Sequence, residues 1–286
     1  MLGLSILKRV CMKSKLFFLA ALALTSSLTA PNVRAHEFWM WADPFFPKVA
    51  ADANITLNVG EYFKGDLIGF ATINVAAVHR YSAGKVENLQ ERVLPNVILP
   101  GLELNFAKAG THMVSFDSHP SQIVLPADKF SAYLHDEGLD DIIRQREKSG
   151  NTATPGRERF WRCVKTLLSV GGKSDATHAV HTKQRIEIVP LNDPFSKNSK
   201  RAGLDFSILF DGKPLASALV KAWHKKDEQI IMIRATSSGD GKVHFDLPLD
   251  GGWMFSVVHM IPVVDSAEVD WDSYWGSLIF ALPQRR

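Results

Sequence analysis

The sequence is poor in cysteine and has none of the short motifs that mark the common enzyme classes. Its 286 residues include two cysteines. It has no CxxC pair, no HExxH, no GxSxG, no Walker loop and no GxGxxG. These absences argue against the zinc proteases, α/β-hydrolases, P-loop NTPases and Rossmann enzymes that such motifs identify. A metal site in this chain must be assembled from residues that are distant in sequence.

The sequence also lacks an apolar run long enough for a confident membrane span. The longest one, LFFLAALALTSSLTA at 16–30, falls short of the ~20 residues that a spanning helix needs. A basic start precedes this run, and Val-Arg-Ala, ending at Ala35, follows it. This order is typical of a cleavable signal peptide. We predict a signal peptide over residues 1–35 and a soluble periplasmic chain that begins at His36.

The net positive charge of the sequence comes from that leader. Translation can start at Met1 or at Met12. Residues 1–35 hold five of the 33 basic residues and no acids, which leaves 28 against 30 acids, a net charge of −2. A nucleic-acid partner would need a persistent basic stripe, so we expect none. Only Cys163 remains after cleavage. Without a disulfide, the exported chain must be stabilised by its core, in which we place Cys163.

The apolar pattern predicts a mainly β protein with two β-sandwich domains and a small α-helical insertion between them. Residues 36–126 read as short strands separated by turn residues, and so do residues 184–286, which suggest a Greek-key sandwich. Residues 127–170 carry apolar side chains at helical spacing, including RERFWRCVKTLLSV near their end. We interpret the acids of this insertion as a solvated helix face. Residues 171–183 are the predicted linker.

The ten histidines of the chain are the main candidates for metal ligands. If cleavage follows Ala35, His36 offers both its α-amine and a ring nitrogen, and nitrogen-rich sites suit copper, nickel, cobalt or zinc. His259 ends an apolar strand, where an imidazole needs a polar partner. His112 is the third candidate ligand. Each of these histidines has a plain structural alternative, as a chain start or a core residue bonded to backbone.

Two acids near the C-terminus are candidates for supporting such a site. Asp270 and Asp272 flank Trp271 just before the last predicted strand. They can supply oxygen ligands, or accept a hydrogen bond from a ligand histidine. The alternative is a solvated loop in which Trp271 packs against the protein.

Several stretches together resemble a known family. They are AHEFW, PADKFSAYLHDEGLDDI, PGRERFWR, IEIVPLNDPF, FDGKPLASALVKAW and GGWMFSVVHMIPV. The chain resembles exported bacterial proteins of undefined function that are related to the periplasmic component of nickel and cobalt uptake systems. Its C-terminal part is similar to transthyretin-like or carboxypeptidase-regulatory domains. The resemblance implies a metal-related role, with His36 at the position of the N-terminal ligand and a membrane metal transporter as a partner.

Three functions remain open from the sequence. The leading one is a periplasmic nickel, cobalt or copper protein that binds or delivers its ion without catalysis. An N-terminal histidine can also form the copper brace of an oxidase acting on polysaccharide. The third is a non-catalytic envelope or sugar-binding protein, in which His36 is only the first residue of the processed chain.

Overall fold

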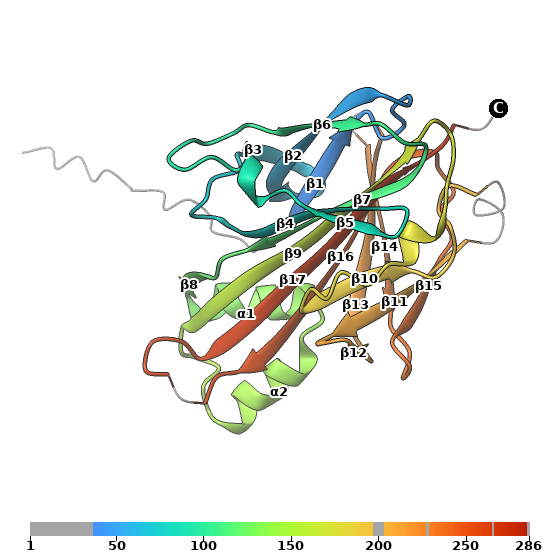
Figure 1. Cartoon of the computed structure of the whole chain (residues 1–286). Helices are drawn as coiled ribbons and strands as arrows, with labels where there is room; N and C mark the ends of the chain where they lie inside the picture. Colours follow the sequence, from blue (N-terminus) through green and yellow to red (C-terminus); the bar gives the residue numbers. More distant parts are fainter. Residues whose placement is uncertain (1–36, 197–202, 227–228, 265, 285–286) are drawn as a thin grey trace, which may run out of the picture. The chain divides into compact units, whose positions relative to one another are not determined.

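The structure, a computed structural model, describes residues 37–196, 203–226, 229–264 and 266–284. Within these segments the chain is built almost entirely of β-strands, with two α-helices (Figure 1). The predicted mainly β fold class is confirmed. No helix of these segments is both long enough and apolar enough to span a bilayer.

A nine-stranded sheet, here the central sheet, forms the middle of the structure. Its strand order is β14-β13-β16-β17-β9-β7-β4-β5, and β8 also pairs with β9. Strands β9 and β17 run parallel, and the other pairs are antiparallel. The bounds are β4 (Val75–Ser82), β5 (Lys85–Asn88), β7 (Gly110–Ser118), β8 (Ser121–Leu125), β9 (Gly156–Val170), β13 (Leu219–Lys226), β14 (Gln229–Thr236), β16 (Gly251–Pro262) and β17 (Trp271–Leu282).

Two four-stranded sheets accompany the central sheet. The first small sheet contains β1 (Glu37–Asp43), β2 (Ala51–Glu61), β3 (Lys64–Ile68) and β6 (Leu102–Phe106). The second small sheet contains β10 (Ile186–Pro190), β11 (Leu204–Phe210), β12 (Lys213–Pro214) and β15 (Lys242–Phe245). Two short 3-10 helices, η1 (Gln90–Arg92) and η2 (Ala176–Ala179), lie in the connections.

The two small sheets cover opposite faces of the central sheet, as the alternation of side chains along β9 shows. Val164 and Leu168 pack into the core beneath the first small sheet. Cys163 and Leu167 pack into the core beneath the second. Neighbouring side chains of a strand point to opposite faces, so each core occupies one side. We call the side of Val164 the first face and the side of Cys163 the second face.

The helices α1 (Ala127–Asp136) and α2 (Asp140–Lys148) pack on the first face, beside the first small sheet (Figure 1). Their apolar side chains bury Met260 of β16. Gly138 separates them with a φ of 66°, and a Cβ at this position would lie 2.7 Å from the Cβ of Leu219. A glycine is therefore needed both for the left-handed turn and for the close approach to β13.

The structure corrects the sequence at the end of the predicted helical insertion, 127–170. The helices end at Lys148, and the RERFWRCVKTLLSV run forms β9. Residues 163–170 are all buried because both faces of this strand are covered. Their sequence therefore has no alternation of period two, and such apolar runs cannot be assigned from periodicity alone. The two predicted sandwiches share the central sheet, with the C-terminal strand β17 paired to β9.

A matched pair of substitutions tests whether the two cores unfold together. Leu167→Ala and Leu168→Ala remove fully buried side chains from the second and the first core. Each should lower the free energy of unfolding by about 2–5 kcal/mol. Because both cores share β9, calorimetry should show a single unfolding transition that each variant shifts. Val124→Ala, at a 63% exposed position, should change stability by less than about 0.5 kcal/mol. Two transitions, each sensitive to one variant, would contradict a shared core.

Candidate functional site

The predicted ligand His112 lies on β7 on the first face, next to the first small sheet. Its ring meets the Phe106 ring edge-on at 5.0 Å, and its Nε2 is 2.9 Å from the Lys108 carbonyl oxygen. Its buried Nδ1 has no hydrogen-bond partner among the described residues. Burial lowers the pKa of His112. The ring is therefore a neutral part of a packed core edge.

The predicted ligand His259 lies on β16 on the opposite side of the central sheet. Its ring centroid is 4.4 Å from that of Phe210, in the second small sheet. Burial lowers its pKa, and the charge of Asp211 acts in the other direction. A β-sheet lies between His112 and His259, so the two rings cannot hold the same ion. The structure does not bring these predicted ligands together.

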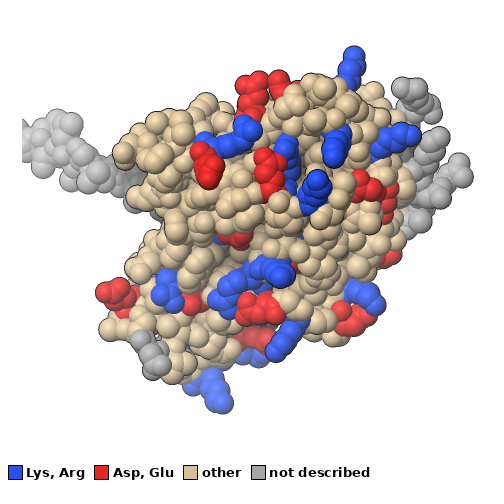
Figure 2. All heavy atoms as spheres, viewed as in Figure 1, with Lys and Arg blue, Asp and Glu red and all other residues tan. Residues whose placement is uncertain are grey.

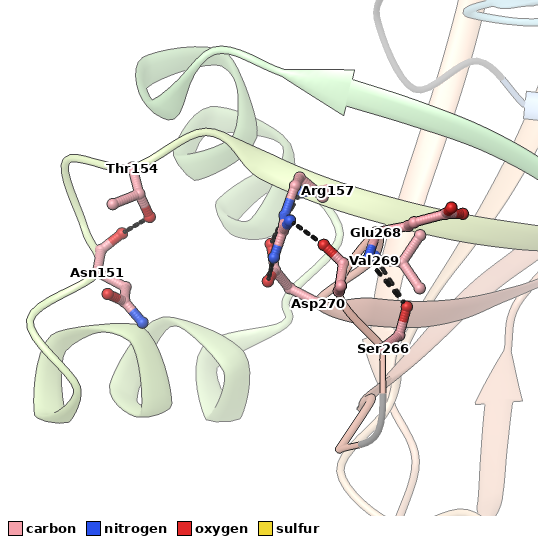
Figure 3. Close-up of polar contacts among 8 residues, drawn as sticks. Asn151, Thr154, Arg157, Ser266, Glu268, Val269 and Asp270 are labelled. Atoms are coloured by element: carbon pink, nitrogen blue, oxygen red, sulfur yellow. Dashed lines mark hydrogen bonds and ion pairs between the residues drawn. The ribbon is translucent and has the colours of Figure 1, made fainter.

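The predicted supporting acids Asp270 and Asp272 are engaged by arginines of β9. The guanidinium of Arg157 donates to both carboxylate oxygens of Asp270, at 2.6 and 3.0 Å (Figure 3). Arg159 donates to both oxygens of Asp272, at 2.8 and 2.9 Å. Bidentate pairs of this kind fix geometry as well as charge. These acids therefore tie the start of β17 to β9 and do not orient a histidine.

Other charged side chains on the visible surface are also interspersed. Figure 2 shows basic and acidic groups next to one another on the face viewed, without a large patch of one sign.

The loop before β17 is held by its own polar contacts. Ser266 Oγ accepts hydrogen bonds from the backbone N–H groups of Glu268 and Val269, at 3.1 and 3.2 Å (Figure 3). Side-chain and backbone groups of this loop therefore form hydrogen bonds with one another.

His36 and the predicted signal peptide, 1–35, lie outside the described residues. Within the described part of the chain, no group of three or more histidine, cysteine, aspartate or glutamate side chains could hold a metal ion. Glu37, the first described residue, belongs to a group of buried polar side chains on the first face. We call this group the buried polar cluster; it consists of Glu37, Tyr133, Glu137, Glu158, Lys221 and Ser273.

One half of the buried polar cluster is centred on Lys221 of β13, whose side chain is 1% exposed. Its ammonium lies 2.8 Å from Glu137 Oε1 and 3.0 Å from Asp136 Oδ2, both on α1 or at its end. Burial lowers the pKa of Lys221, but the two carboxylates outweigh it and raise the pKa overall. The pKa of Glu37 is raised to about 7, mainly by burial and also by the charge of Glu137, while Lys221 acts in the opposite direction.

The other half is centred on Glu158 of β9, which is 2% exposed. Glu158 Oε1 accepts hydrogen bonds from the Ser273 hydroxyl and, at 3.2 Å, from the Tyr133 hydroxyl. Trp275 Nε1 donates to Ser273 Oγ at 3.1 Å, and its ring stacks on Tyr133 at 5.6 Å. Burial raises the pKa of both Glu158 and Tyr133. Tyr133 also responds to the charge of Glu137, which links the two halves.

Secondary structure explains how residues so distant in sequence meet. Tyr133 and Glu137 are four residues apart, so they project from the same side of α1 and its C-cap. Glu158 shares the first face with Val164, since their positions along β9 differ by an even number. Sequence reasoning missed this cluster because its members come from five separate segments. Lys221, inside the apolar run ALVKAW, was the available signal, because a lysine there needs a buried partner.

The cluster brings proton-exchanging groups and oxygen donors into a site of low dielectric. Glu37, Glu137 and Glu158 are buried carboxyl groups with perturbed pKa values. Concentrated perturbation of this kind is typical of functional sites, although structural ion pairs also produce it. The cluster therefore contains carboxyl groups whose raised pKa values favour the protonated form, and the pKa of Glu37, about 7, lies near neutral pH.

These observations define a mainly β protein with one central sheet, two covering sheets and a buried polar cluster at the start of its first strand. The chain belongs to a family described as a domain of unknown function, DUF4198, whose model matches residues 33–261. The curated proteins contain no match to the sequence.

Among solved structures, one similar chain is a tetra-tandem repeat in the extending region of a large adhesion protein, with 11% identity and a TM-score of 0.22. The match covers 87% of this chain and 50% of that one. The present chain thus spans about half the length of that structure.

The raised pKa of Glu37 has a testable consequence for stability. The folded-state pKa is about 7 against an ordinary value of 4.5, so the folded protein binds more protons between these pH values. Rising pH should therefore remove stability across this window, by up to about 3 kcal/mol. Glu37→Gln should abolish this contribution, whereas Glu103→Gln, at an exposed position, should not. Urea unfolding at pH 5 and pH 8 in metal-free buffer measures it. Equal pH dependence in wild type and Glu37→Gln would contradict the assignment.

The buried ion pair of Lys221 with Glu137 can be compared with the exposed ion pair of Arg234 with Asp136. Lys221→Met leaves Glu137 buried without its cation and should cost about 3–5 kcal/mol. The double variant Lys221→Met/Glu137→Leu should regain most of that stability, because no unpaired charge remains. Arg234→Met removes the exposed ion pair to Asp136 and should cost less than about 1 kcal/mol. Denaturant unfolding distinguishes these cases. Equal losses in Lys221→Met and Arg234→Met would refute the special role of burial.

Proposed function

We propose that this protein is an exported transition-metal-binding protein, without a catalytic step, that holds nickel, cobalt or copper at the start of its processed chain. The α-amine and the imidazole of His36 supply the nitrogen ligands. Oxygen donors come from the carboxylates of the buried polar cluster. Processing after Ala35 is part of the proposal, because only cleavage frees the amine.

The observation that carries the proposal is the environment of Glu37. This residue directly follows His36, and it is buried near Glu137 and Asp136, which raise its pKa, and near Lys221, which lowers it. A cation bound by His36 would lie one residue away, within electrostatic reach of those groups. It would stabilise the ionised form of Glu37, which burial otherwise disfavours. The start of β1 is therefore electrostatically suited to a bound cation.

The chemistry of the donor set also fits a borderline transition metal. A primary amine and an imidazole favour nickel, cobalt, copper or zinc, and a carboxylate can complete the coordination. His112 is left out of this set because its ring is already engaged. The ring packs against Phe106, and its Nε2 lies 2.9 Å from the Lys108 carbonyl oxygen. His259 is excluded because it lies on the second face.

The resemblance to periplasmic components of nickel and cobalt uptake systems supports a role in delivery to a membrane metal transporter. Coordination through a terminal amine fits such a role, because an ion held by few protein ligands can pass to a second set of ligands. A transthyretin-like C-terminal part belongs to the same resemblance. The partner and the direction of transfer belong to the proposal as well.

Isothermal titration of the processed chain tests the site. A protein that begins at His36 should bind Ni²⁺, Co²⁺ or Cu²⁺ with a Kd below about 1 μM. His36→Ala should weaken binding at least about tenfold. One alanine added before His36 should have a similar effect, because it keeps the imidazole and converts the amine into an amide. Sequencing the N-terminus of protein purified from the periplasm checks the cleavage.

The matched control is His135→Ala, which removes an exposed imidazole from α1 and should leave affinity unchanged. Glu137→Gln should weaken binding while the amine and imidazole remain. No binding of these ions below about 1 μM, or binding indifferent to His36→Ala, would overturn the proposal.

A further inference from the structure

The central sheet ends in a long edge strand, β14. This strand stands first in the strand order and pairs with β13 on one side. Within the described segments, the backbone of residues 229–236 forms hydrogen bonds with β13 and with no other strand. In an antiparallel pair, the N–H and C=O groups of every second residue point away from the partner strand. β14 therefore presents a row of backbone donors and acceptors that can pair with another strand.

The opposite edge of the central sheet is protected in ways that β14 is not. That edge is β5, which has four residues and carries Lys85 and Glu87. Short length and charged side chains are common means of preventing edge-to-edge association. β14 is twice as long, with eight residues, and its sequence QIIMIRAT has one charged residue and no proline. A strand that joins this sheet should therefore do so at β14.

The side chains of β14 are apolar on both faces of the sheet and only partly covered. Ile230 and Met232 pack against the core of the first face, and Ile233 packs against the core of the second face. Each of them is nevertheless half-buried, because no described strand continues the sheet beyond β14. A further strand would cover the exposed part of these side chains, which is favourable in proportion to the apolar area buried.

The charge of β14 does not oppose association with an identical strand. Its single charged residue, Arg234, lies 3.0 Å from a carboxylate oxygen of Asp136, at the end of α1. The ion pair balances the charge within each copy. Two β14 strands can therefore lie side by side without the repulsion that unbalanced like charges cause across a strand pair.

We propose that two copies of this chain associate edge to edge through β14, in antiparallel order about a two-fold axis perpendicular to the sheet. An identical antiparallel strand offers an acceptor to each outward N–H group and a donor to each outward C=O group. Because both copies use the same edge, the contact closes at two copies and does not continue into a fibre. The proposal is independent of the proposed metal site.

The symmetry also limits the register of the pairing. A two-fold axis perpendicular to the sheet keeps the first faces of both copies on one side, so residues opposite each other must belong to the same face. The register centred on Met232 fulfils this condition. It places Ile231 opposite Ile233 of the second copy, an apolar pair of the kind that stabilises neighbouring strands.

The size of the contact predicts a dimer that dissociates at moderate concentration. Eight residues of strand extend over about 26 Å, so the strand pair covers less than the roughly 800 Å² per partner of a standard interface. Sedimentation equilibrium of the purified protein in metal-free buffer should show monomer and dimer with a Kd of about 1–100 μM. A protein that stays monomeric up to about 500 μM, or an assembly that grows beyond two copies, would overturn the proposal.

A charge on the edge tests the position of the contact. Ile231→Lys should weaken dimerisation at least about tenfold, because lysine on an edge strand opposes pairing. Val124→Lys is the matched control, at a 63% exposed residue of β8, and should leave the Kd unchanged. Dimerisation that is indifferent to Ile231→Lys, or equally weakened by Val124→Lys, would contradict an interface at β14.

A cross-link tests the register without adding a charge. Met232→Cys brings two thiols together at the two-fold axis, where strand spacing suits a disulfide. Mild oxidation should convert this variant largely into a covalent dimer, whereas Val124→Cys should cross-link only slightly. Cys163 is buried and should not contribute. Equal cross-linking of the two cysteine variants would overturn the proposal even if Ile231→Lys fails to fold.

Discussion

The parallel pairing of β9 with β17 is the constraint on which the rest of the structure depends. It joins residues 156–170 to the last strand of the chain, residues 271–282, in the middle of the central sheet. The two strands are covered on both faces, so each side of the pair forms the floor of a different core. The same pairing places Glu158 and Ser273 on one face, and thus builds one half of the buried polar cluster.

How much of this could be predicted depends on how each strand is covered. β6 alternates buried and exposed residues, the pattern from which short strands were predicted over residues 36–126. β9 is buried on both sides over residues 163–170, and its apolar run is equally compatible with a helix. The sharing of one central sheet by the two predicted sandwiches could not be predicted for a related reason. The strand β17, near the end of the described chain, pairs with β9 although about a hundred residues lie between them. No local sequence pattern in either segment predicts a pairing between strands so far apart in sequence.

The candidate site shows the same limit. The predicted supporting acids Asp270 and Asp272 were chosen from their neighbourhood in sequence, but their partners are Arg157 and Arg159. The two acids are two positions apart, and so are the two arginines. In extended backbone this spacing places both acids on one side of their strand and both arginines on one side of theirs. That match becomes informative only when the pairing of β9 with β17 is known. His112 and His259 were likewise predicted as ligands because imidazoles bind metals. Their separation by a sheet depends on how the strands pair, which the sequence does not show.

The first strand brings together two kinds of contact on the first face. Glu37 belongs to the buried polar cluster, and the ring of its neighbour Phe38 lies 4.6 Å from the central carbon of the Arg162 guanidinium. Buried charged groups such as Lys221 and Glu137 are often no more stabilising than apolar residues of similar volume. Stability alone therefore gives little reason for a lysine and several carboxylates beneath β1. The cation that we propose at the start of that strand would account for the carboxylates, and Lys221 offsets part of their charge in its absence.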